Sequence, residues 1–107
     1  MDEERARRLA RNEAIARDVN EATGEVAARW HRDDEPIELI CECSQESCSE
    51  RVRVTASEYA EVRAHDARFL VRDEHVREEI ERRVGTAGDA TVVEKIGPGR
   101  QVAEETA

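Results

Sequence analysis

The chain has 107 residues, of which 40% are charged and only 3% are aromatic, and its formal net charge is −9. A chain of this length is expected to fold as one domain, and so few aromatic residues leave little apolar material for a core. Small cores of this kind are often stabilised by a metal, a disulfide or a partner. The acidic excess disfavours nonspecific nucleic-acid binding, because basic groups on phosphates supply most of that affinity.

The sequence also indicates where the protein works. No segment approaches the roughly 18 consecutive apolar residues of a membrane span. The first residues, MDEE, lack the basic and apolar regions of a signal peptide. We therefore expect a cytoplasmic protein, in which a structural disulfide is not favoured and three cysteines cannot all pair within one chain.

The first third of the chain predicts one long helix over residues 3–31, with no proline and one interior glycine. Its weak apolar stripe consists of Leu9, Ala16, Val19, Val26 and Trp30, flanked by Ile15 and Ala22. Such a helix is about 40 Å long. A domain this small should not cover that length, so part of the helix should project or pack against a second copy in a coiled-coil or helical-hairpin dimer.

After an acidic linker that ends at Pro36, the pattern changes to strands. Residues 37–43 and 51–55 predict a hairpin with the cysteines at its tip, and Thr55-Ala-Ser-Glu58 fits the capping box of a helix that ends near Asp66. Residues 69–71 predict a strand, residues 76–84 a third helix closed by Gly85, and residues 91–96 the last strand.

The predicted fold class is therefore α+β, with a long N-terminal helix followed by a small β-β-α-β-α-β body and a cysteine-bearing hairpin. We expect the helix and linker to occupy residues 1–35 and a metal-stabilised domain to occupy residues 36–97. The polar segment 98–107 is expected to be a disordered tail.

All three cysteines lie in the segment CECSQESC, residues 41–48. In a strand, residues i and i+2 point to the same face, so Cys41 and Cys43 should present their sulfur atoms together, and a short turn can bring Cys48 beside them. Three thiolates with a histidine can bind zinc in a tetrahedron.

Three histidines are candidates for the fourth ligand: His75, His65 and His31. We favour His75 because the loop before the third predicted helix can be directed back at the hairpin, and His65 is the second choice. Four glutamates surround the thiols in sequence: Glu38, Glu42, Glu46 and Glu50. Their field should raise the pKa of the thiols, which opposes a free thiolate, whereas a bound dication reverses that effect.

Other chemistries stay open at this point: three unligated buried cysteines, an iron–sulfur cluster, or a thiol–disulfide centre. The C-x-C spacing is less diagnostic of zinc than C-x2-C pairs. A zinc with three thiolates and a histidine has no open position for water, so it would be structural. The sequence contains no H-E-x-x-H or G-x-S-x-G motif, and we do not expect an enzyme.

The segments RNEAIARDVNEA, CECSQESCSERV, TASEYAEVRAHDARFLV and VVEKI resemble a family of small uncharacterised proteins of high-GC Gram-positive (actinobacterial) bacteria. The resemblance covers roughly residues 11–96, and the use of sixteen arginines against one lysine fits such a genome. It implies a C-E-C-x4-C segment and a later histidine in a proline–glycine–histidine loop, where this chain has Arg72-Asp73-Glu74-His75. The resemblance supports the architecture and the metal but implies no activity.

Three hypotheses of function follow. The first is a zinc-stabilised interaction or regulatory module whose N-terminal helix binds a protein partner or a second copy, with Trp30 and the apolar stripe as the contact face or, alternatively, packed on the protein's own sheet. The second is an iron–sulfur or dithiol redox protein. The third, disfavoured by charge, is a small nucleic-acid-binding zinc protein acting through the arginines of residues 5–17.

Overall fold

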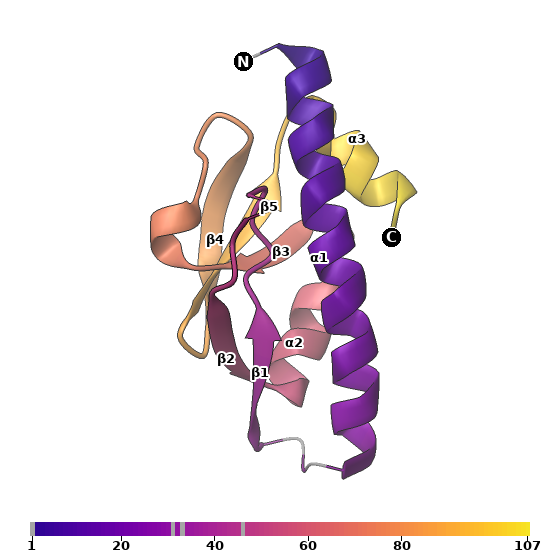
Figure 1. Ribbon diagram of the computed structural model, residues 1–107, viewed down its shortest axis with the longest axis vertical. Helices are drawn as coiled ribbons and strands as arrows, with labels where there is room; N and C mark the ends of the chain where they lie inside the picture. Colours follow the sequence, from indigo (N-terminus) through magenta and orange to yellow (C-terminus); the bar gives the residue numbers. More distant parts are fainter. Residues whose placement is uncertain (1, 31, 33, 46) are drawn as a thin grey trace.

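Helix α1 (Glu3–Trp30) runs the length of the molecule, and in the view of Figure 1 the strands lie to its left and the C-terminal helix to its right. The computed structural model describes residues 2–30, 32, 34–45 and 47–107. The molecule measures 42 × 25 × 24 Å, so its long axis matches the roughly 42 Å expected of a 28-residue helix. The α+β class and the long N-terminal helix are confirmed.

The remaining elements form two small antiparallel sheets and two short helices. They are β1 (Pro36–Ile40), β2 (Arg51–Thr55), α2 (Ala56–Arg63), β3 (Arg68–Val71), the 3-10 turn η1 (Asp73–His75), β4 (Glu81–Ala87), β5 (Ala90–Lys95) and α3 (Pro98–Glu105). Strands β1 and β2 pair as a hairpin, and β5 lies between β3 and β4 in the second sheet. The capping box is formed, since Glu58 N–H donates to Thr55 Oγ1 and Thr55 N–H donates to Glu58 Oε1.

The third predicted helix, over residues 76–84, is wrong: residues 81–87 form strand β4. The turn Gly88-Asp89 joins β4 to β5 as a two-residue hairpin loop, and Gly88 has a φ of +55° that favours glycine. A Cβ on Gly88 would lie 1.9 Å from the backbone oxygen of Arg53, so only glycine fits there. The hydrogen bonds that pair β4 with β5 outweigh the helical spacing of Val76, Ile80 and Val84. Val84 lies where the register of the β4–β5 pairing shifts.

The disordered tail is also wrong, because residues 98–105 form helix α3, which packs on the N-terminal half of α1. Proline stands in the first turn of α3, where its missing N–H costs nothing. Gly99 allows a close approach, since a Cβ there would lie 3.3 Å from both Ala10 Cβ and Lys95 Cε. The expected projection of α1 is therefore not seen: its buried residues extend from Ala6 to Ala27.

Most of the apolar stripe of α1 does not pack on the protein's own sheet, which was one of the two alternatives that the sequence left open. The inner face of α1, which lies against the body, consists of buried small and polar residues: Ala6, Ala10, Glu13, Ala14, Arg17, Asn20 and Ala27. The outer face of α1 carries most of the apolar stripe: Ile15, Val19, Ala22, Val26 and Trp30. The helix is therefore held to the body chiefly by hydrogen bonds and close backbone packing, and its larger apolar side chains remain in contact with solvent.

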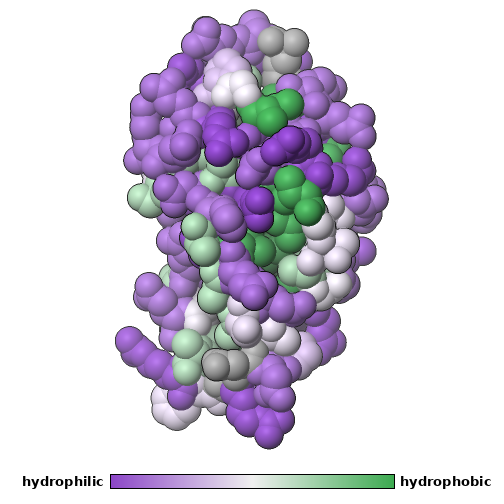
Figure 2. All heavy atoms as spheres, turned by 180° about the vertical axis from the view of Figure 1, so that it is seen from behind, coloured by the Kyte–Doolittle hydropathy of each residue, from purple (hydrophilic) through white to green (hydrophobic). Residues whose placement is uncertain are grey.

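The core is small, as the composition predicts. One cluster joins the β1–β2 hairpin, α2 and the second sheet, and another surrounds Phe69 and Val93 beside the cysteines. Figure 2 shows that hydrophilic residues cover most of the face opposite to that in Figure 1, where hydrophobic residues form only small patches. No helix in the described ranges is both long enough and apolar enough to cross a membrane.

Candidate metal centre

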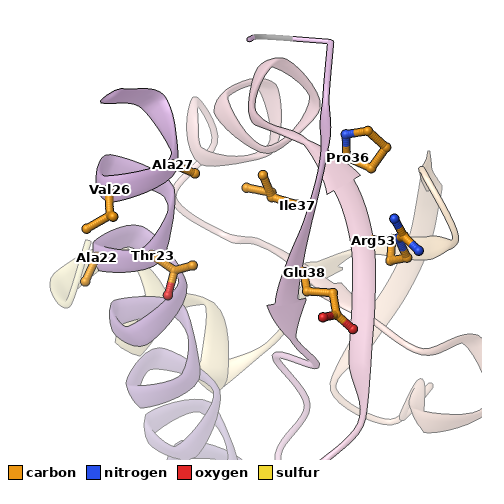
Figure 3. Close-up of a pocket in the computed structure, with 8 residues that line it drawn as sticks. All are labelled: Ala22, Thr23, Val26, Ala27, Pro36, Ile37, Glu38 and Arg53. Atoms are coloured by element: carbon orange, nitrogen blue, oxygen red, sulfur yellow. The ribbon is translucent and has the colours of Figure 1, made fainter. Parts of the chain in front are cut away.

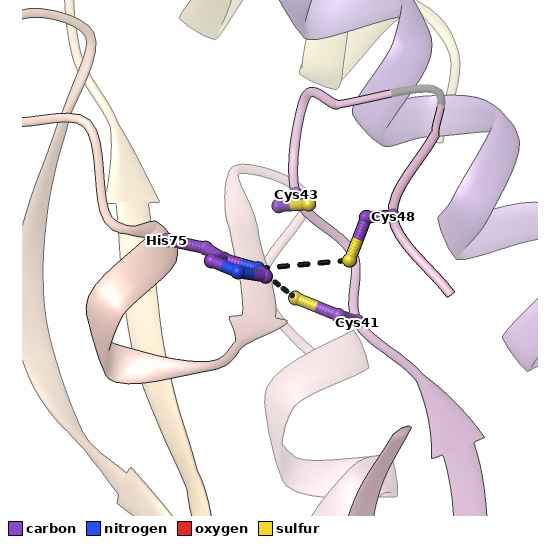
Figure 4. A group of neighbouring side chains, drawn as sticks. All are labelled: Cys41, Cys43, Cys48 and His75. Carbon is purple, nitrogen blue, oxygen red and sulfur yellow. Dashed lines mark hydrogen bonds between the residues drawn. The ribbon is translucent and has the colours of Figure 1, made fainter. Parts of the chain in front are cut away.

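The three cysteines and His75 converge, as the sequence predicts (Figure 4). The ligand atoms of this Cys3His cluster (Cys41, Cys43, Cys48 and His75) all lie within 4.8 Å of one another. His75 Nδ1 is 3.5 Å from Cys41 Sγ and 3.6 Å from Cys48 Sγ. A tetrahedron with the usual Zn–S and Zn–N bond lengths has S···N edges of about 3.6 Å. The spacing of the side chains therefore fits a tetrahedral metal ion.

The cysteines lie in the loop between β1 and β2 and not in a strand, because β1 ends at Ile40. The loop is fixed at its start on both sides: Cys41 N–H donates to the carbonyl of Glu50, and Glu42 N–H donates to the carbonyl of Leu70. The convergence of sulfur atoms is as predicted, but the loop backbone, rather than the alternation of a strand, produces it.

His75 is brought to the cluster by η1, which is anchored on the second sheet. Arg83 Nε donates to Asp73 Oδ1 at 2.9 Å, and Thr91 Oγ1 donates to the same oxygen at 2.9 Å. The next residue toward β3 also contributes, because Arg72 N–H donates to Cys41 Sγ at 3.2 Å. Backbone donors of this kind stabilise a thiolate and orient it toward a metal.

Two asparagines of α1 hold the opposite side of the cysteine loop. Asn20 donates to the carbonyl of Ile40 and accepts from its N–H, while Asn12 donates to the carbonyl of Ser44. These backbone groups flank the Cys41–Cys43 segment on both sides. Neither asparagine was predicted to have a role, although both stand in the segment RNEAIARDVNEA, which carries the resemblance.

Glu42 separates the two buried cysteines in sequence, but its carboxylate is held away from them. It accepts hydrogen bonds from Leu70 N–H at 2.8 Å, Tyr59 O–H at 2.9 Å and Asn20 Nδ2 at 3.0 Å. Burial raises the pKa of Glu42, and these donors together with the charge of Arg63 oppose that rise. Through these hydrogen bonds, the buried Glu42 side chain links the cysteine loop to α1, α2 and β3.

Hydrogen bonds among the cysteines and burial shift the pKa values of the three thiols. A hydrogen bond with Cys41 lowers the pKa of Cys43 to about 5, despite the opposing effect of burial. The pKa of Cys41 is raised by the same hydrogen bond and by burial, and the pKa of Cys48 is raised chiefly by burial. The pKa values of Cys41 and Cys48 are raised, as predicted, but the charges of the neighbouring glutamates are not among the main causes: Glu42 is turned away and Glu50 pairs with Arg72.

The other predicted residues do not join the cluster. His65 follows the end of α2, is exposed, and is not part of the cluster. The candidate His31, and Glu46 in the cysteine loop, lie outside the described residues. Asp34 and Glu35 of the predicted linker pair with Arg32.

The donor set determines what this centre can do. Thiolate and imidazole ligands in a tetrahedron suit zinc or iron and do not suit magnesium or calcium, which prefer oxygen. With four protein ligands on one ion, no position is open for a substrate or water. Comparison with protein-family models, with curated proteins and with solved structures gave no match. The resemblance to the actinobacterial family therefore stays a prediction.

Proposed function

We propose that the Cys3His cluster binds one structural zinc ion and that the protein is a non-enzymatic interaction module of the cytoplasm, which binds a helix of another protein or of a second copy through the outer face of α1. The observation that carries this proposal is that the large apolar side chains of α1 are exposed to solvent. Polar residues occupy its buried face, while Ile15, Val19, Val26 and Trp30 are 65%, 48%, 57% and 80% exposed.

The zinc assignment is supported by geometry and by the size of the core. The S···N distances fit the edges of a zinc tetrahedron, and the backbone of Arg72 donates to one sulfur. Metal binding would join the β1–β2 loop, which carries the three cysteines, to η1, which carries His75. Because zinc binding is coupled to folding, such a link contributes directly to the free energy of unfolding.

The outer face of α1 has the pattern of a helix–helix contact. Its residues at positions 15, 19, 22, 26 and 30 are spaced by three or four along the helix, and the face ends in the chain's single tryptophan. Tryptophan is enriched among the residues that dominate binding energy at interfaces. The net charge of −9 makes nucleic acid an unfavourable partner for the protein as a whole.

A shallow cavity of about 680 Å³ adjoins the C-terminal half of this face (Figure 3). Val26 and Ala22 point away from β1, whereas Thr23 and Ala27 point toward Ile37. A helix lying on the outer face could extend one row of side chains into this cavity and so contact both α1 and β1.

Elemental analysis and an absorbance spectrum of tag-free protein test the metal. We expect about one zinc per chain, from the four ligands, and no visible absorbance. Iron with a coloured spectrum would support the iron–sulfur alternative instead, and a metal-free folded protein would contradict both.

The emission of Trp30 tests the interaction face, since it is the only tryptophan. If α1 binds a second copy, the emission shifts to shorter wavelength as concentration rises, and sedimentation shows a dimer. Val26→Asp should abolish both effects, whereas Val84→Asp on β4 should not. A monomer at all concentrations assigns the face to another protein, and an unchanged Trp30 spectrum on addition of any purified binding protein would contradict the proposal.

A further inference from the structure

The Cys3His cluster borders a cavity of about 340 Å³ on the side of α1. Its walls include all three cysteines and the helix residues Ile15, Ala16 and Val19. His75 approaches the sulfur atoms from η1, on the side away from α1 (Figure 4). A small molecule can therefore reach the sulfur atoms from the cavity without passing the imidazole.

The three sulfur ligands are not equally accessible. Cys41 and Cys43 are each 4% exposed, whereas Cys48 is only partly buried. A molecule that enters the cavity thus meets Cys48 first. The other two sulfur atoms lie within 4.8 Å of it, so a second thiolate stands ready to react with any product formed at Cys48. An accessible thiolate beside a resolving cysteine is the arrangement found in oxidation-sensitive thiols.

We propose that Cys48 is a modification site for hydrogen peroxide, and that its oxidation releases the metal. This inference rests on the proposed function, because it requires a metal that holds the three cysteines as thiolates. A small uncharged oxidant such as peroxide suits this cavity, whose walls on the helix side are largely apolar.

The reaction balances as two steps. The Cys48 thiolate attacks one peroxide oxygen, an S–O bond forms, the O–O bond breaks, and the departing hydroxide takes up a proton as water. The thiolate of Cys43 or Cys41 then attacks the Cys48 sulfur, a disulfide forms, the S–O bond breaks, and the departing hydroxide takes up a second proton as water. The two thiolates together lose two electrons and one peroxide gains them. A disulfide in place of two thiolates would leave only two protein ligands for the metal, too few to hold it.

Release of the metal would also loosen the cysteine loop from α1. Asn12 and Asn20 hold the backbone on either side of Cys41 and Cys43, and these hydrogen bonds depend on the loop keeping its shape. Ile15 and Val19 belong both to the outer face of α1 and to the cavity wall. A partner bound on that face would cover the cavity, so partner binding should slow oxidation, and oxidation should weaken binding by the same coupling.

The test uses the zinc-loaded full chain, whose metal content is measured before any oxidant is added. Hydrogen peroxide is then added, and released zinc is followed with a chromophoric chelator while the intact mass and the cysteine pairing are read by mass spectrometry. We expect one zinc released per disulfide, a mass lower by the two hydrogens lost, and Cys48 in that disulfide. Protein without zinc at the outset contradicts the proposed function; zinc that stays bound in excess peroxide contradicts this inference alone.

Two helix variants test the cavity as the route and leave all four ligands intact. Ala16→Leu fills the cavity beside the cysteines, and the matched control Ala28→Leu makes the same change at an α1 alanine that lies away from both the cysteines and the outer face. Ala16→Leu should release zinc several-fold more slowly than wild type, and the control should release it at the wild-type rate. Equal rates for both variants, or a disulfide that joins Cys41 to Cys43 and leaves Cys48 free, would overturn the proposal.

Discussion

Asn20 and Ile40 are joined by two hydrogen bonds that imitate the pairing of neighbouring strands. Asn20 Nδ2 donates to the Ile40 carbonyl at 2.8 Å, and Ile40 N–H donates to Asn20 Oδ1 at 2.9 Å. The side-chain amide thus closes the edge of β1 immediately before Cys41. Asp89 does the same for β2, since it accepts from Arg53 N–H through its carboxylate and donates its own N–H to the Arg53 carbonyl. Each outer edge of the β1–β2 hairpin thus has one residue whose backbone groups are hydrogen-bonded by a residue outside the hairpin.

Replacing Asn20 by alanine should therefore weaken the metal centre without removing a ligand. The change removes the hydrogen bonds that Asn20 makes with the Ile40 backbone and with one oxygen of Glu42, all of them away from solvent. We expect the free energy of unfolding to fall by about 2 to 4 kcal/mol. Zinc affinity, measured by competition with a chelator, should fall as well. Thr23→Ala on the exposed side of α1 is the control, and equal stability of the two variants would contradict this role.

Cys43→Ser should abolish cooperative unfolding of the body or greatly lower its melting temperature. The substitution removes one of four ligands, and structural zinc binding is coupled to folding. The neighbouring Ser44 offers a matched control: its hydroxyl is buried and, within the described residues, makes no hydrogen bond, so Ser44→Ala should be neutral or slightly stabilising. Calorimetry with parallel zinc analysis measures both, and an unchanged transition and metal content in Cys43→Ser would disprove the structural role.

His75→Ala should weaken zinc retention far more than His65→Ala. His75 Nδ1 lies 3.5 and 3.6 Å from two of the sulfur atoms, while His65 is exposed and lies outside the cluster. A chelator challenge that follows the zinc released from each variant over time measures the difference. The reverse order would move the fourth ligand to His65.

The buried charges of Glu13, Glu81 and Lys95 predict an unusual pH dependence. Lys95 Nζ lies 2.5 Å from Glu13 Oε1 and 3.0 Å from Glu81 Oε1, and burial raises the pKa of Glu13 well above its usual range. A carboxyl group whose pKa is higher in the folded state than in the unfolded state adds stability below its unfolded pKa, and this contribution is lost as the pH rises through the folded value.

Glu13→Gln keeps the shape and cannot ionise. The free energy of unfolding of wild type minus that of Glu13→Gln should therefore fall as the pH rises above the usual glutamate value of 4.5. Urea titrations at several pH values and constant zinc loading measure this difference in the free energy of unfolding. Glu58→Gln provides a control of opposite sign, because the Thr55 N–H lowers the pKa of Glu58 and its contribution is lost as the pH falls. A Glu13 difference that is flat with pH would show that burial does not govern this carboxyl.

Elements with strong short-range signals could be predicted from the amino-acid sequence. The proline-free run predicted α1, the Thr55–Glu58 pair predicted the start of α2, and the close spacing of three cysteines predicted that their sulfur atoms converge. It also predicted His75 as the histidine that meets them. Each of these features depends on residues a few positions apart or on the requirement for one more ligand.

Contacts between distant segments, which the sequence does not reveal, set the environment of these elements. Pairing with β5 makes residues 81–87 a strand, although the spacing of Val76, Ile80 and Val84 predicts a helix over residues 76–84. The turn at Gly88-Asp89 was the overlooked signal for the hairpin. Contact with α1 ordered the segment after Pro98 as a helix.

The inner face of α1 is the clearest example of a feature that depends on contacts between distant segments. The sequence left open whether the apolar stripe faces the body or a partner. Arg17, on the opposite face, is fully buried because its guanidinium donates to backbone carbonyls of Asp66 and Ala103 and lies over the ring of Phe69. Burial of a polar group is favourable only when distant segments supply its partners, and those partners lie 49 and 86 residues away along the chain. Which face of α1 turns inward is therefore a property of the assembled fold.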